Sequence, residues 1–179
     1  MFEVYRSDEL ENAIDFLEQA AVFYKDNESN HRFKWVCISL HGALYGFAVC
    51  NVRGTNPSDR VLVESKREKK YYERDLKGIG GVLKLCQNKD MLTTEFGKVL
   101  ELKENQRLSI DLLKKYRDDF SHFKPSGYSI IGSLDEVVLP VLEVIYFLAI
   151  ESNNVLYSSR NQRERIIQAI NTFELGIIN

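Results

Sequence analysis

Apolar residues recur at intervals of three and four along residues 7–25, 105–122 and 158–175. This spacing places them on one face of an α-helix, so each stretch is predicted to form an amphipathic helix. Ser7 or Asp8 can cap the first helix. In chain order, the three stripes are Leu10, Ala13, Ile14, Leu17, Ala20, Ala21 and Tyr24; Leu108, Leu112, Tyr116, Phe120 and Phe123; and Ile166, Ile167, Ala169, Ile170 and Phe173.

Two further stretches, residues 33–52 and 134–152, are apolar nearly all round and are predicted to be buried helices. Gly42 and Gly46 lie four residues apart and share a face, which lets another helix approach closely. Pro140 fits a helix only near its first turn, because proline lacks a backbone N–H. Neither stretch is expected to span a membrane, since the first contains polar residues and the second is short.

The helical pattern breaks over residues 54–81, which are predicted to form a long loop or a frayed helix. A glycine-rich hinge is expected at residues 77–81. Two short segments, 61–63 and 128–131, are the strand candidates.

Residues 82–102 are expected to contain one or two short helices, with Thr93 or Thr94 as an N-cap. The sequence therefore predicts an all-α fold. We expect a bundle of four or five main helices with short extra helices, in a single domain over residues 1–179.

Charge is balanced: the 179 residues include 24 basic and 26 acidic side chains, for a net charge of −2. Nucleic-acid binding through bulk positive charge is therefore excluded, and such binding needs a local patch. Residues 66–77 offer one, with tyrosines that can stack on unpaired bases, although an ordinary solvated loop has the same composition. The candidate RNA-contacting residues are Lys66, Arg67, Lys69, Lys70, Tyr71, Tyr72 and, further along, Lys124.

Three widely spaced cysteines form no C-x-x-C pair, which excludes a zinc ribbon and a thioredoxin-like centre. Reduced, buried thiols are expected, as in a cytoplasmic protein, and the N-terminal residues lack a signal-peptide pattern. No metal or cofactor is predicted. Of the three histidines, His31 is expected in solvent, and His41 is expected to be buried and bonded to a backbone or hydroxyl group.

The third histidine belongs to a cluster of chemically capable side chains at the end of a predicted helix. Asp118 and His122 are four residues apart, about 40° around the helix, so they are able to hydrogen-bond. Arg117 supplies a planar cation suited to phosphate. These are the parts needed to cleave a phosphodiester by proton transfer without a metal.

Geometry separates two members of this cluster, because Arg117 and His122 lie five residues apart, about 140° on a straight helix. A distorted helix end, or two copies meeting at a two-fold axis, would bring them together. The alternative is that Arg117, Asp118 and Asp119 are solvated charges, with the two carboxylates available to pair with Lys114 and Lys115. His122 then only caps the helix C-terminus.

Arg117-Asp118-x-x-x-His122 resembles the R-x4-6-H motif of the HEPN superfamily. The longer phrases RDDFSHFKPSGYSI and WVCISLHGALYGFAVCNV resemble the motif region and second helix of uncharacterised bacterial HEPN-like proteins. The resemblance implies an all-α homodimer with the motif near the dimer interface. It also implies a metal-independent endoribonuclease, of the kind found among toxins and defence proteins, with RNA as substrate and an antitoxin among its potential partners.

In the implied mechanism, His122 moves protons for attack by the RNA 2′-OH, Arg117 stabilises the phosphorane, and Asp118 orients one of them. The alternative function is a non-catalytic homodimeric module that binds a partner protein, a nucleotide or RNA. A nuclease requires an accessible His122 in a basic groove with Arg117 nearby. A structural cluster would instead bury His122 or tie Arg117 to neighbouring carboxylates.

Overall fold

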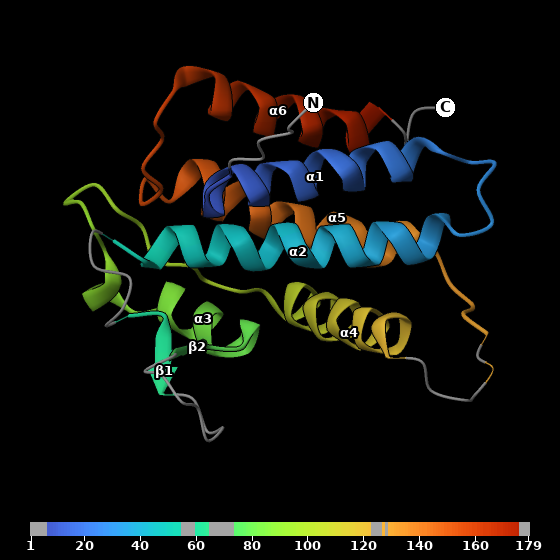
Figure 1. Ribbon diagram of the computed structural model, residues 1–179, viewed down its shortest axis with the longest axis horizontal. Coiled ribbons are helices and arrows are strands. Elements are labelled where there is room, and N and C mark those ends of the chain that lie inside the picture. The colour runs from blue at the N-terminus through green and yellow to red at the C-terminus, as the bar shows by residue number, and fades with distance from the viewer. Residues whose placement is uncertain (1–6, 55–59, 65–73, 123–126, 128, 176–179) are drawn as a thin grey trace, which may run out of the picture.

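A computed structural model describes residues 7–54, 60–64, 74–122, 127 and 129–175. Within these ranges the chain forms six α-helices and one two-stranded sheet, which confirms the all-α prediction (Figure 1). The helices are α1 (Glu9–Lys25), α2 (Arg32–Val52), α3 (Ile79–Cys86), α4 (Glu104–Ser121), α5 (Leu134–Tyr146) and α6 (Arg160–Leu175). The shorter elements are the strands β1 (Leu62–Glu64) and β2 (Arg74–Leu76), the 3-10 turn η2 (Lys89–Met91) and the π-helical turn η3 (Phe147–Glu151).

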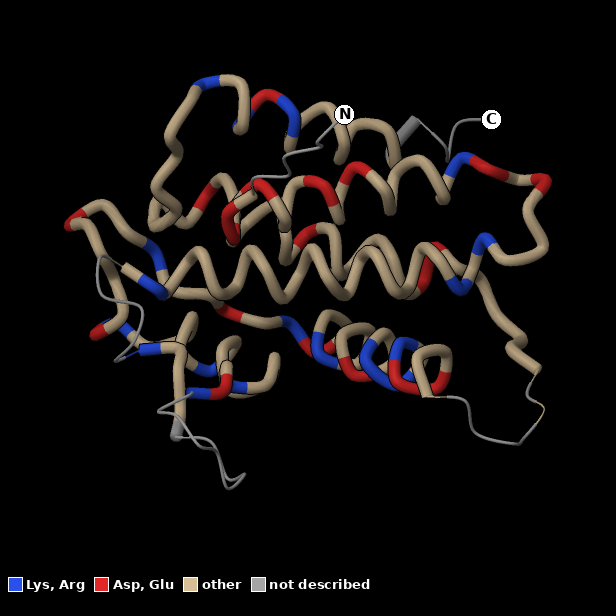
Figure 2. Tube along the Cα trace, in the orientation of Figure 1, with Lys and Arg blue, Asp and Glu red and all other residues tan. Residues whose placement is uncertain are grey.

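Helix α2 lies at the centre of the bundle and contacts α1, α3, α4 and α5. Figure 1 shows α6 covering α1 on one side of α2, while α3 and α4 lie on the other side. The charged residues of α2, Arg32 and Lys34, both lie at its N-terminal end (Figure 2). By length and composition α2 also qualifies as a membrane span, but 72% of its most apolar window is buried inside the protein, as expected for a core helix.

The close approach of α1 and α2 depends on the two glycines of α2. A Cβ atom at Gly42 would lie 2.7 Å from the Phe16 ring, and one at Gly46 would lie 2.6 Å from the Ala13 Cβ. Both distances are far below van der Waals contact, so α1 packs directly on the α2 backbone. The predicted apolar stripe of α1 is buried along its whole length, and Asp8 caps the helix by accepting from the Glu11 N–H at 2.8 Å.

Helix α5 contains Pro140 at its seventh residue, beyond the first turn where the sequence placed it. Because proline has no N–H, the Glu136 carbonyl one turn earlier loses its helical donor. The Ser109 hydroxyl of α4 donates to that carbonyl at 3.1 Å instead. The helix then widens into η3, where buried Asn51 of α2 donates to the Leu148 carbonyl at 3.0 Å.

The apolar stripe predicted for α4 is wrong at its first residue, because Leu108 is 61% exposed, whereas Leu112, Tyr116 and Phe120 pack against the core. The buried residues of the helix are Gln106 and Ser109 together with Ile110 and Leu113. Both polar residues are satisfied across the interface: the Gln106 amide donates to the Glu143 carboxylate at 2.8 Å, and Ser109 donates as described above. Leu112, Tyr116 and Phe120 are partly buried, and Phe123 lies outside the described residues.

Two local predictions in the middle of the chain were wrong. Thr93 and Thr94 start no helix: the segment after η2 runs without regular structure to α4, and the Thr93 N–H lies 3.4 Å from Asn154 Oδ1. The glycine-rich hinge instead begins α3, with the Gly78 carbonyl accepting from the first helical turn.

The strand β1 was anticipated, but its antiparallel partner β2 lies in the charged run predicted as loop or frayed helix. In the segment 128–131, residues 129–131 form no strand, and residue 128 lies outside the described residues. In α6, Ile167 is 37% exposed, against its predicted burial.

Candidate functional site

Arg117 of α4 and His41 of α2 meet at the centre of the site, although 76 residues separate them in the chain. Arg117 Nη2 lies 3.3 Å from His41 Nε2, and Arg117 Nη1 lies 2.8 Å from Asp118 Oδ1. The Nε atom of Arg117 is buried and has no hydrogen-bond partner within the described residues. The guanidinium is therefore fixed from two sides, while 32% of the side chain stays exposed to solvent.

His41 is only 4% exposed and is a neutral acceptor for Arg117. Burial, together with the smaller effect of the adjacent Arg117 cation, lowers the pKa of His41 to about 4. An arginine can only donate hydrogen bonds, so His41 Nε2 accepts and the ring proton belongs on Nδ1. The burial of His41 was predicted, but its expected backbone or hydroxyl partner is replaced by a cation.

Aromatic rings hold α4 against α2 beside this contact. The Phe33 ring of α2 lies 5.1 Å from Tyr116 and 6.3 Å from Phe120, in edge-to-face arrangements. On the other side of His41, the Tyr45 ring packs edge-on at 6.3 Å. The Tyr45 hydroxyl donates to the Lys77 carbonyl, which joins α2 to the segment entering α3.

Asp118 and His122 are not hydrogen-bonded through their side chains within the described residues. The Asp118 carboxylate goes to Arg117 instead, and the His122 backbone N–H donates to the Asp118 carbonyl at 3.0 Å. His122 is the C-cap of α4 and has extended backbone angles of φ −105° and ψ 112°. Its side chain is exposed.

One chain thus holds Arg117 toward α2 and leaves His122 in solvent at the end of the same helix. This arrangement follows from the five-residue spacing, which separates the two side chains around α4. It meets one requirement of each function considered above: His122 is accessible, as a nuclease needs, and Arg117 is tied to a carboxylate, as a structural cluster would be.

All seven residues predicted to contact RNA lie outside the described residues. They are Lys66, Arg67, Lys69, Lys70, Tyr71, Tyr72 and Lys124. Sequence reasoning did not include His41 and Tyr45 in the site. The signal that would have favoured them is their spacing of four residues on one face of a helix otherwise almost free of polar side chains.

A groove of about 240 Å³ lies between α3 and α4. Ile79 and Leu83 of α3 and Ile110 of α4 contribute apolar surface to it. Three cations from the two helices, Lys84, Arg107 and Lys114, line the groove together with one carboxylate, that of Asp111. Figure 2 shows the basic and acidic residues interleaved along α4.

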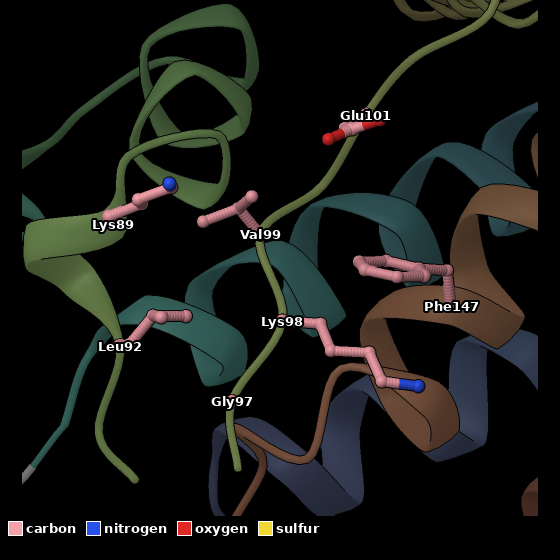
Figure 3. A pocket seen from close by; sticks show the side chains of 7 residues that line it. All are labelled: Lys89, Leu92, Gly97, Lys98, Val99, Glu101 and Phe147. Atoms are coloured by element: carbon pink, nitrogen blue, oxygen red, sulfur yellow. The ribbon is translucent and has the colours of Figure 1, made fainter. Parts of the chain in front are cut away.

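A second hollow, of about 430 Å³, lies between η2, the segment leading to α4, and η3 (Figure 3). Figure 3 shows that the amines of Lys89 and Lys98 point to different places, and that the Glu101 carboxylate lies away from both. This hollow therefore lacks the convergent polar groups that fix a ligand. Within the described ranges, no three His, Cys, Asp or Glu side chains are grouped to hold a metal ion.

Comparisons of this chain with protein-family models, curated proteins and solved structures find no match.

Proposed function

We propose that this protein is a metal-independent endoribonuclease of the HEPN type that acts as a cytoplasmic homodimer. The observation that carries the proposal is a preorganised guanidinium on the same helix as an exposed imidazole. Arg117 is fixed by His41 and Asp118 but keeps part of its surface in solvent, and the His122 side chain is exposed at the end of that helix. Fixed cations stabilise developing charge without reorganising during the reaction.

In the proposed reaction the RNA 2′-oxygen bonds to phosphorus and the bond from phosphorus to the 5′-oxygen breaks. One His122 imidazole accepts the 2′-OH proton, and a protonated imidazole donates to the leaving 5′-oxygen. Two copies around a two-fold axis provide both imidazoles, and they also bring a His122 to the Arg117 of the other copy. The products are a 2′,3′-cyclic phosphate and a 5′-OH.

The decisive experiment is cleavage of a mixed-sequence single-stranded RNA in EDTA by the wild type, His122→Ala and His31→Ala. His31 is the matched control, because it is also an exposed histidine beside a helix end. We expect cyclic-phosphate products from the wild type and the control, and their loss in His122→Ala. Equal cleavage by all three proteins would indicate a contaminant and contradict the proposal, as would absence of cleavage by the purified dimer.

The second candidate function is a non-catalytic homodimeric module that binds RNA, a nucleotide or a partner protein such as an antitoxin. The 2.8 Å ion pair between Arg117 and Asp118 favours it, because the pair neutralises part of the charge that a phosphate would meet. Sedimentation of the protein with a labelled oligonucleotide, in the absence of cleavage, would support this function over the first.

A further inference from the structure

The groove between α3 and α4 has the composition of a site for a charged, partly apolar ligand. Its floor is apolar, because Ile79, Leu83 and Ile110 are nearly inaccessible to solvent. Its volume of about 240 Å³ is below the roughly 300–1,000 Å³ of typical small-molecule pockets. The space therefore suits one flat group of a longer ligand rather than a whole cofactor.

The positive charges of the groove are not neutralised by ion pairs within the described residues. Within the described residues, Lys84, Arg107 and Lys114 form no ion pair, whereas other basic side chains such as Arg53 and Lys103 do. Arg107 uses only its Nε, which donates to the Leu102 carbonyl at 3.3 Å. The single carboxylate of the groove, Asp111, leaves an excess of positive charge facing it.

The same face of α4 continues from the groove to the Arg117 site. At about 100° per residue, Arg107, Lys114 and Asp118 lie within about 40° of one another around the helix axis. Lys114 is also among the cations that lower the pKa of His41, as expected if it lies near the Arg117 contact. Along the axis, Lys114 precedes Arg117 by about 4.5 Å and His122 by about 12 Å.

We propose that the groove between α3 and α4 binds an unpaired nucleotide of single-stranded RNA beside the phosphate held at Arg117. The base lies on the floor of Ile79, Leu83 and Ile110, and the backbone phosphates contact Lys84, Arg107 and Lys114. A single strand of RNA presents phosphates to the cations and a flat base to the apolar slot. An acidic peptide would match the cations but offers no flat group for the slot. This assignment rests on the proposed function and names the path of its substrate.

The test uses a fluorescein-labelled 2′-O-methyl oligonucleotide, which lacks the nucleophilic 2′-OH and stays intact whether or not the protein is a nuclease. Anisotropy titrations compare the wild type with Lys84→Glu and Lys114→Glu. Arg163→Glu is the matched control, because Arg163 is exposed on α6, on the far side of the bundle. Each groove substitution should weaken binding by about threefold or more and reduce the salt-dependence slope by about 0.7, the value for one lost phosphate contact on a single strand.

A second variant tests the slot without changing charge. Gly80 lines the groove, and a Cβ there would meet nothing within 4 Å, so Gly80→Leu adds apolar bulk at the groove from a position with open space. We expect weaker binding at unchanged thermal stability. Binding equal to wild type in Gly80→Leu, or equal losses in the groove and control charge reversals, would overturn the proposal. A further contrary result would be a polyglutamate peptide whose binding is weakened by the groove substitutions while binding of the oligonucleotide is not.

The outcomes separate this proposal from the catalytic one. Groove-dependent binding of the 2′-O-methyl strand by a protein that cleaves no RNA would retain the groove and reject the nuclease. Cleavage that depends on His122 but is indifferent to Lys84, Lys114 and Gly80 would retain the nuclease and reject the groove.

Discussion

Arg165 and Arg117 each join two helices, and their guanidinium groups are satisfied to different degrees. Arg165 of α6 donates to both oxygens of Glu18, at 2.8 and 2.7 Å, and to Glu11 at 2.8 Å, so carboxylates on α1 engage every nitrogen of its guanidinium. Arg117 has one carboxylate, one neutral imidazole and a buried Nε without a partner in the described part of the chain.

The difference between the two arginines distinguishes a structural ion pair from a candidate binding site. Two carboxylates neutralise Arg165 and raise its pKa above the ordinary value, while hydrogen bonds from Gln162 and Arg165 lower the pKa of Glu11. Arg117 meets a neutral acceptor because burial keeps His41 uncharged. Its positive charge is only partly compensated, which leaves it able to attract an anion.

The strongest test of this contrast replaces each arginine with alanine and compares the loss of activity. Arg117→Ala should reduce RNA cleavage by about 10²- to 10³-fold, the usual effect of removing one fixed group that stabilises transition-state charge. Arg165→Ala should leave cleavage per folded molecule within about twofold of wild type. Both are measured under single-turnover conditions with the folded fraction fixed by circular dichroism. Similar losses of activity in the two variants would remove the distinction between them.

The next largest effect concerns pH and the neutral state of His41. Its pKa is near 6.5 when unfolded and about 4 when folded, so between these values the unfolded chain binds the extra proton. Stability from this group is therefore present above about pH 6.5 and is lost as pH falls toward 4, by up to roughly 3 kcal/mol.

The measurement for His41 is urea unfolding at pH 7.5 and pH 4.5 for the wild type and His41→Gln. The glutamine amide oxygen still accepts from Arg117 but does not titrate, so the variant should lose less stability on acidification. Asp118 and Lys114 also face His41. The wild type and His41→Gln both retain these residues, so the difference between their stability losses reports on the imidazole. Parallel losses in the two proteins would contradict a neutral, buried His41.

The structural arginine should show its effect in stability. Arg165→Ala leaves Glu11 and Glu18 facing each other's charge without the shared cation, and we expect unfolding to become easier by about 1–2 kcal/mol, because these partly exposed pairs form a network. Arg160→Ala is the matched control on the same helix. Its 3.7 Å pair with Glu164 is exposed, and its loss should be negligible. Chemical denaturation of both variants at pH 7 provides the comparison.

The two arginine sites also show what the sequence could predict. The main helices were found because their apolar periodicity is local, and the capping of α1 by Asp8 follows from residues three apart. The buried residues in the first half of α4 were missed because Gln106 and Ser109 are buried through partners on α5, and no local pattern indicates those partners. Polar burial of this kind depends on tertiary hydrogen bonds.

The candidate site was predictable only in part, for the same reason. The Arg117, Asp118 and His122 spacing indicated phosphate chemistry, and the helical angle indicated that one chain would separate Arg117 from His122. The local spacing did not determine whether the Asp118 carboxylate would pair with Arg117 or with His122. It pairs with Arg117, whose side chain is fixed by His41 on another helix. Contacts between α2 and α4 cannot be predicted from the spacing of residues a few positions apart.

The smallest predicted effect tests whether Asp118 limits the charge available at Arg117. Asp118→Asn removes one negative charge but keeps a hydrogen-bond acceptor 2.8 Å from Arg117 Nη1. Since the pair is one-third exposed, unfolding should change by less than about 1 kcal/mol. Affinity for the 2′-O-methyl strand should rise about two- to threefold, because less of the guanidinium charge is compensated. Asp111→Asn is the matched control within the groove, and a loss of affinity in Asp118→Asn would mean that Arg117 needs its carboxylate to stay in place.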